Sequence, residues 1–228
     1  AWAKRHGLLT IVDNTLLTTY LQRPIEWGAD IVVHSATKYL GGHNDVLAGM
    51  IVTKGSDLSQ QMAFLHNSIG AVLGPQDSWL LMRGMKTLAL RMQRHEANAT
   101  ALAEFLQRHP LVQEVYYPAL PEHPGHDIQR KQSSGNTGIF SFRVKDARLV
   151  EPILRHIKLI AFAESLGGVE SLMTYPAVQT HADIPEDIRR RVGVDDRLLR
   201  LSAGIEHIDD LIADLEQAFE QARREIEG

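Results

Sequence analysis

Two short apolar runs near the start of the chain most constrain its fold. The sequence is LLTIV at residues 8–12 and DIVVH at residues 30–34, with a helix-sized stretch between the two runs. Such β-branched runs are typical of strands buried in a parallel sheet, and two parallel strands need a long crossover that is usually helical. The spacing therefore predicts a parallel βαβ step. A third run, GMIVT at residues 49–53, predicts a further strand.

The rest of the chain predicts a second region of helices and strands. Apolar residues recur every three, four or seven positions from Leu81 to Leu106, which indicates one long amphipathic helix or two in sequence. Further strands are expected at residues 113–118, 138–144 and 198–204, followed by a final amphipathic helix. We expect an α/β protein with one domain over residues 1–110 and a smaller one over residues 111–228.

Composition excludes several classes of function. The chain has 228 residues, a net charge of -4 and no cysteine. It therefore offers neither a basic surface for nucleic acid nor a thiol for a disulfide or a nucleophile. No apolar run approaches the length of a membrane span, so we expect a cytoplasmic protein without a membrane partner. Because the chain begins without methionine, in a stretch resembling the end of a helix, we expect it to be part of a longer protein.

Four polar or charged residues stand just beyond the carboxyl ends of two predicted strands. Asp13 follows the first strand, and Ser35, Thr37 and Lys38 follow the second. Ligands of open α/β sheets bind at this edge. We therefore expect the four side chains to converge on one crevice.

These residue types match the chemistry of pyridoxal phosphate. A lysine amine forms an imine with an aldehyde, hydroxyls bind a phosphate, and a carboxylate keeps a pyridine nitrogen protonated. Spacing alone leaves a plainer alternative open, in which Lys38 is a solvated surface residue and Asp13 belongs to a turn. Nucleotide-binding loops are less favoured, because neither GxGxxG nor GxxxxGK[ST] occurs. The histidines of HPGH, His123 and His126, have no acid pair nearby, so we expect no metal site.

A longer stretch resembles a known family. The segment VDNTLLTTYLQRPIEWGADIVVHSATKYLGGHNDVLAG is similar to the active-site segment of the Cys/Met-metabolism enzymes, the pyridoxal-phosphate enzymes of transsulfuration. The resemblance continues, in the family's order, through GPQDSWLLMRGMKTLALRM, ESLGGVESLMTYPAVQTHADIP and LLRLSAGIEHIDDLIADLEQAF. It implies an aspartate-aminotransferase-like fold (fold type I), with part of the large cofactor domain and the small C-terminal α/β domain present here. It also implies homodimers or homotetramers with shared active sites.

The resemblance implies roles for individual positions. Lys38 resembles the lysine that binds the cofactor as an imine, Asp13 the partner of the pyridine nitrogen, and Ser35 and Thr37 the phosphate contacts. Arg200 resembles the arginine that binds the substrate carboxylate. The residue itself supports this role, because a guanidinium among the apolar neighbours of LLRLS needs an anionic partner. An internal salt bridge is the alternative.

Glu164 and Ser165, in FAESLGG, bear on the substrate and the reaction. Ser165 resembles a serine near the substrate carboxylate; otherwise it is an ordinary loop serine. Relatives with γ-chemistry tend to carry an acid at the position of Glu164, where a carboxylate can orient a distal amino group; a surface glutamate is the alternative. We therefore expect a methionine-biosynthesis activity like that of cystathionine γ-synthase, γ-replacement on an O-acylhomoserine. Cystathionine β-lyase or γ-lyase activity is the alternative, and an inactive fragment is the second alternative.

Overall fold

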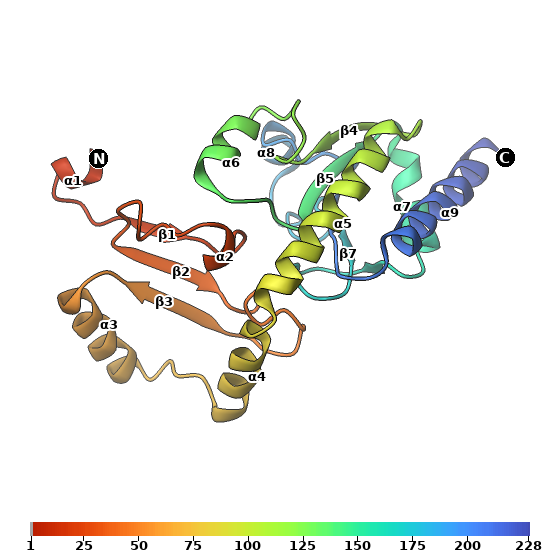
Figure 1. The fold of residues 1–228 in the computed structure, drawn as a ribbon. Coiled ribbons are helices and arrows are strands. Elements are labelled where there is room, and N and C mark those ends of the chain that lie inside the picture. Colours follow the sequence, from red (N-terminus) through yellow and green to blue (C-terminus); the bar gives the residue numbers. More distant parts are fainter. Residues whose placement is uncertain (1) are drawn as a thin grey trace. The chain divides into compact units, whose positions relative to one another are not determined.

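The computed structural model describes residues 2–228, which form two compact units. The first unit runs to Leu90 and includes residues 132–134, and the second holds Arg91–Lys131 and Gly135–Gly228. Each unit has its own sheet, with strand order β1-β2-β3 in the first and β4-β5-β8-β7-β6 in the second (Figure 1).

The first sheet confirms the parallel step predicted from the sequence. Its strands are β1 (Ile11–Asp13), β2 (Ile31–Ser35) and β3 (Gly49–Thr53). β1 and β2 are parallel, and β3 runs antiparallel to β2, which lies between the other two strands (Figure 1).

The crossover between β1 and β2 is built mainly from turns. Its helix, α2 (Thr18–Leu21), is a single turn, shorter than the helix-sized stretch suggested. The buried Asn14 amide donates to the carbonyl oxygens of Thr18 (2.9 Å) and Gln22 (3.0 Å), and so fixes this turn beside the end of β1. The other helices of the unit are α1 (Trp2–Arg5), α3 (Ser56–Ile69) and α4 (Pro75–Met85).

The amphipathic stretch from Leu81 to Leu106 forms two helices in sequence, one of the two arrangements expected. α4 ends at Met85 and α5 (Leu88–Arg108) follows. The domain boundary expected at residue 110 stays a prediction, and the two compact units divide within α5, after Leu90. The reason is that most of α5, including Leu102 and Leu106, packs into the core of the second unit.

The second sheet contains the three strands predicted from the sequence and two more. Its strands are β4 (Val112–Tyr116), β5 (Ile139–Val144), β6 (Ala161–Phe162), β7 (Leu172–Thr174) and β8 (Leu198–Ser202). β6 and β7 have 2 and 3 residues, too few for a pattern of alternation to reveal them. The remaining helices are α6 (His126–Gln132), α7 (Val150–His156), α8 (Glu186–Arg191) and α9 (Ile208–Glu227), with a 3-10 turn at Ala147–Leu149.

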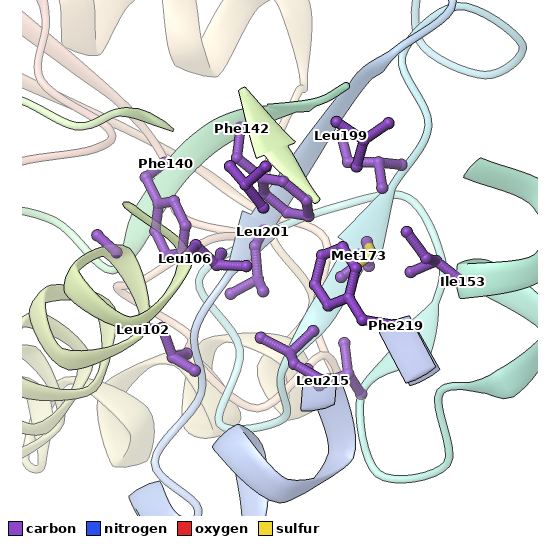
Figure 2. Close-up of a cluster of buried hydrophobic side chains, with 14 of the residues drawn as sticks. Leu102, Leu106, Phe140, Phe142, Ile153, Met173, Leu199, Leu201, Leu215 and Phe219 are labelled. Carbon is purple, nitrogen blue, oxygen red and sulfur yellow. The ribbon is translucent and has the colours of Figure 1, made fainter. Parts of the chain in front are cut away.

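One apolar core joins this sheet to its helices. Figure 2 shows Leu102 and Leu106 of α5, Ile153 of α7 and Phe219 of α9 gathered against side chains of the sheet. α7 and α9 lie side by side in Figure 1 and contact each other. No helix within residues 2–228 is both long enough and apolar enough to cross a membrane.

Candidate active site

Asp13 and Ser35 lie at the same edge of the first sheet and on the same face. Asp13 ends β1 and is the cross-strand partner of Val33 in β2. Ser35 stands two positions after Val33, and strand side chains alternate between faces, so Ser35 shares the face of Asp13. The pairing register therefore supports the expected convergence of these two side chains.

Thr15, which sequence reasoning did not single out, connects these two positions. Its N–H donates to Asp13 Oδ1 (2.9 Å), and its Oγ1 accepts from the N–H of Ser35 (2.7 Å). The hydroxyl of Thr15, followed by its N–H, holds the pKa of Asp13 below its usual range. Asp13 is therefore an anion at neutral pH, as a partner of a protonated ring nitrogen must be. The Asp-x-Thr pattern of a side-chain-capped turn is the local signal that could have identified Thr15.

Lys38 stands on a tight turn that reverses the chain after β2. The N–H of Lys38 donates to the carbonyl of Ser35 (3.2 Å), and its own carbonyl accepts from the N–H of Gly42 (2.8 Å). Tyr39 and Leu40, the next two residues, are buried at 0% and 3% exposure. Lys38 itself is half-buried. The turn after β2 therefore holds the backbone of Lys38 in place on both sides of the residue.

Two glycines allow close backbone contacts in and around this turn. A Cβ built on Gly84 would lie 2.1 Å from the carbonyl oxygen of Gly41, closer than any real Cβ contact. A Cβ on Gly41 would likewise meet the carbonyl oxygen of Ala36 at 2.9 Å. Gly84 is therefore needed because the backbones of α4 and of the turn touch directly, and Gly41 because the turn closes tightly on itself at Ala36.

We expect Gly84→Ala to destabilise the protein and to loosen the Lys38 turn. The added methyl group forces the backbone of α4 or of the turn to move, at a cost of about 1 to 3 kcal/mol. Urea unfolding measures this change in the free energy of unfolding. Gly49→Ala is the matched control, since a Cβ there meets nothing closer than the His34 carbonyl oxygen at 3.9 Å. An equal urea midpoint for the two variants would contradict the contact.

The hydroxyl of Thr37 forms hydrogen bonds within the protein. Its Oγ1 accepts from the N–H of Ala48 (3.0 Å) and donates to the carbonyl of Ala48 (3.3 Å). These bonds join the turn after β2 to the segment that enters β3. The phosphate contact expected of Thr37 stays a prediction, and so does that of Ser35.

In the second unit, Arg200 lies on the central strand β8, on the face away from the core. Leu199 and Leu201 point into the core (Figure 2), and alternation turns Arg200 to the other side of the sheet. Its Nη2 donates to the carbonyl oxygen of Ser165 (3.2 Å) and to Thr174 Oγ1 (3.1 Å). Among the described residues Arg200 has only these neutral acceptors and no salt bridge, so the internal ion pair held as the alternative is not formed.

Ser165 and Glu164 adjoin Arg200 within this unit. Ser165 has a positive φ of 91°, an uncommon backbone conformation that turns up at ligand-binding loops. Glu164 is exposed. Burial lowers the pKa of the Arg200 guanidinium below its usual value, and the carboxylate of Glu164 partly offsets this effect. Glu164 is thus close enough to act electrostatically on Arg200.

The first unit thus carries an anchored amine, an anionic carboxylate and hydroxyls at one sheet edge. Pyridoxal phosphate needs these groups: an amine that reacts with its aldehyde, a carboxylate that pairs with its ring nitrogen, and hydroxyls that bind its phosphate. The residues present therefore fit this cofactor.

Comparison with known proteins identifies the family. A solved structure of cystathionine gamma-lyase from Lactobacillus plantarum, complexed with L-serine, matches the fold with a TM-score of 0.93 and 47% identity, over 97% of this chain and 58% of that one. The fold is therefore that of fold type I pyridoxal-phosphate enzymes, as predicted. The model of the family "Cys/Met metabolism PLP-dependent enzyme" matches residues 1–220, and the chain belongs to this family of enzymes, whose cofactor is pyridoxal phosphate.

Individual relatives differ in reaction. A cystathionine beta-lyase of Lactococcus lactis subsp. cremoris is 55% identical over 221 residues, 97% of this chain and 58% of the relative. A cystathionine gamma-synthase/O-acetylhomoserine (thiol)-lyase of Bacillus subtilis is 56% identical over 220 residues, 96% of this chain and 55% of the relative. The chain therefore spans little more than half the length of these proteins, and nearly equal identities do not separate the two reactions.

Proposed function

We propose that the protein carrying this chain catalyses cystathionine γ-synthase-like γ-replacement: the Cγ–O bond of an O-acylhomoserine breaks, its acyloxy group leaves as the carboxylate, and the sulfur of cysteine or sulfide bonds to Cγ. The observation that carries this choice is Glu164, an exposed acid next to Ser165, whose carbonyl oxygen accepts from Arg200. Membership of the transsulfuration family supports an amino-acid substrate in general.

The proposal gives each candidate residue a role. When bound, pyridoxal phosphate supplies the electron sink that stabilises a substrate carbanion. Lys38 holds the cofactor through Nζ and, once released, takes and returns protons at substrate carbons. Asp13 keeps a proton on the ring nitrogen, while Ser35 and Thr37 contact the phosphate. Arg200 and Ser165 bind the substrate's α-carboxylate, which suits a guanidinium that lacks an anionic partner among the described residues.

Glu164 supports γ-chemistry in particular. When cysteine is the acceptor, γ-replacement joins two amino acids, so one amino group lies far from the cofactor and needs a hydrogen-bond acceptor. An exposed carboxylate near the carboxylate-binding arginine is free of any ion pair within 4 Å in the part of the chain described, and can accept from that ammonium.

A carbon-sulfur lyase is the second candidate, because a cystathionine beta-lyase is 55% identical to this chain and a gamma-synthase relative 56%. One set of assays separates the candidates. We expect O-acetyl- or O-succinylhomoserine plus cysteine to give cystathionine and the free acid faster than cystathionine alone is broken down. Homocysteine, pyruvate and ammonia from cystathionine at the faster rate would make the protein a β-lyase. Cysteine, 2-oxobutyrate and ammonia would make it a γ-lyase.

A fragment that keeps the fold without the cofactor is the other candidate, since the chain spans 58% of the Lactococcus relative. The purified sample separates these cases directly. Bound pyridoxal phosphate gives a visible absorption band, and a sample saturated with the cofactor that stays colourless after desalting would support the inactive fragment.

Assembly as homodimers or homotetramers in the cytoplasm is part of the proposal. Apolar side chains on α3 and α4 support the assembly, because Phe64, Ile69 and Trp79 are 70%, 72% and 52% exposed. Large apolar side chains exposed on these two consecutive helices would be covered if the helices lay in an interface.

A further inference from the structure

We propose that Thr174 is a positioning residue for Arg200: its hydroxyl holds Nη2 so that the remaining guanidinium donors receive the substrate's α-carboxylate. This inference rests on the proposed function, in which Arg200 binds that carboxylate.

The pairing of β7 with β8 places the two residues together. Thr174 is the direct cross-strand partner of Arg200 in this antiparallel pair. Their neighbours Met173 and Leu201 are also partners and point into the core on the other face (Figure 2). A slip by one residue would bring these apolar side chains out of the core, so burial fixes the register and with it the Thr174–Arg200 contact.

Proton accounting makes the Thr174 hydroxyl an acceptor for Arg200. A hydroxyl has one proton to donate, and Thr174 donates it to the carbonyl oxygen of Ala163 (2.9 Å). Its lone pairs then face the Nη2 donor of Arg200 at 3.1 Å. Because Thr174 is only 1% exposed, water cannot readily replace this bond.

The second acceptor for Arg200 Nη2 lies in a loop that is bonded to β8, the strand of Arg200. The carbonyl oxygen of Ser165 accepts from Nη2, and the nearby loop is pinned where Gly167 N–H donates to Ser202 Oγ (3.0 Å). Nη2 therefore has two acceptors, whereas Nε is buried and has no hydrogen-bond partner among the described residues. A buried donor without a partner indicates a missing acceptor, and a substrate carboxylate would supply it.

Both acceptors are neutral, and this preserves the charge of Arg200. A carboxylate in the place of the Thr174 hydroxyl would orient the guanidinium but also neutralise it. The hydroxyl orients the side chain and leaves its positive charge to attract an anion.

The test compares Thr174→Val, which removes the acceptor, with Thr174→Ser, which keeps it. In the holoenzyme, we expect Thr174→Val to raise the KM of the amino-acid substrate about tenfold with little change in kcat, and Thr174→Ser to remain near the parent protein. Binding of L-serine should weaken by a similar factor, whereas binding of ethanolamine, which lacks the carboxylate, should not change. Thr174→Ala provides the same test if the valine variant does not fold.

Ser141→Ala is the matched control. β8 lies between β5 and β7, and Ser141 of β5 is the cross-strand partner of Arg200 on the side away from Thr174. The structure shows no hydrogen bond between Ser141 and Arg200. Removal of the Ser141 hydroxyl should leave KM unchanged.

A fall in kcat with unchanged KM for Thr174→Val, or equally weakened binding of L-serine and ethanolamine, would overturn the inference. If Arg200→Ala weakens L-serine and Thr174→Val does not, this inference alone fails; if Arg200→Ala has no effect, the proposed function fails.

Discussion

Lys38→Ala should lose the covalently bound cofactor and reduce kcat by roughly 1,000-fold or more, since one amine serves as attachment point and proton carrier. The turn that bears Lys38 is anchored by buried Tyr39 and by the contact of Gly41 with Gly84. The variant should therefore fold and fail only in chemistry. Borohydride reduction followed by peptide mass analysis locates the cofactor bond.

Lys54→Ala is the control for this prediction. Lys54 is an exposed lysine of the same unit, just after β3, and its loss should leave both cofactor and activity in place. Recovery of a reduced cofactor bond at any lysine other than Lys38 would show that the assignment is wrong.

Arg200→Ala should raise the KM for the amino-acid substrate by about 30-fold or more and leave cofactor binding nearly intact. Removing one partner of a buried, charged hydrogen-bonded pair costs roughly 2 to 5 kcal/mol. Arg200 is suited to such a pair because Ser165 and Thr174 accept from one nitrogen only and neither is charged. Steady-state kinetics and the visible spectrum measure the two effects separately.

Arg197→Ala is the matched control. Arg197 stands just before β8 and is already paired with Asp195 at 3.5 Å. Its loss should leave KM unchanged. An unchanged KM for Arg200→Ala as well would contradict the carboxylate role.

Much of the fold could be predicted because its signals are local. The apolar runs at β1, β2 and β3 indicate strands by composition. The spacing of apolar residues within α5 and within α9 indicates amphipathic helices. β6 and β7 were missed because 2 or 3 residues carry no periodicity, and pairing with neighbours makes them strands. The division of the chain within α5 likewise depends on where the helix packs, and its own residues do not reveal this.

By itself the sequence determined which residues stand at the carboxyl ends of strands, so Asp13, Ser35, Thr37 and Lys38 could be named before the fold was known. Tertiary structure alone decided what holds candidate residues in place. The bond from Ser35 to Thr15 spans 20 positions, and the bond from Arg200 to Thr174 spans 26. Such contacts depend on strand register and on burial of the opposite face, and neither is encoded in the few residues around each position.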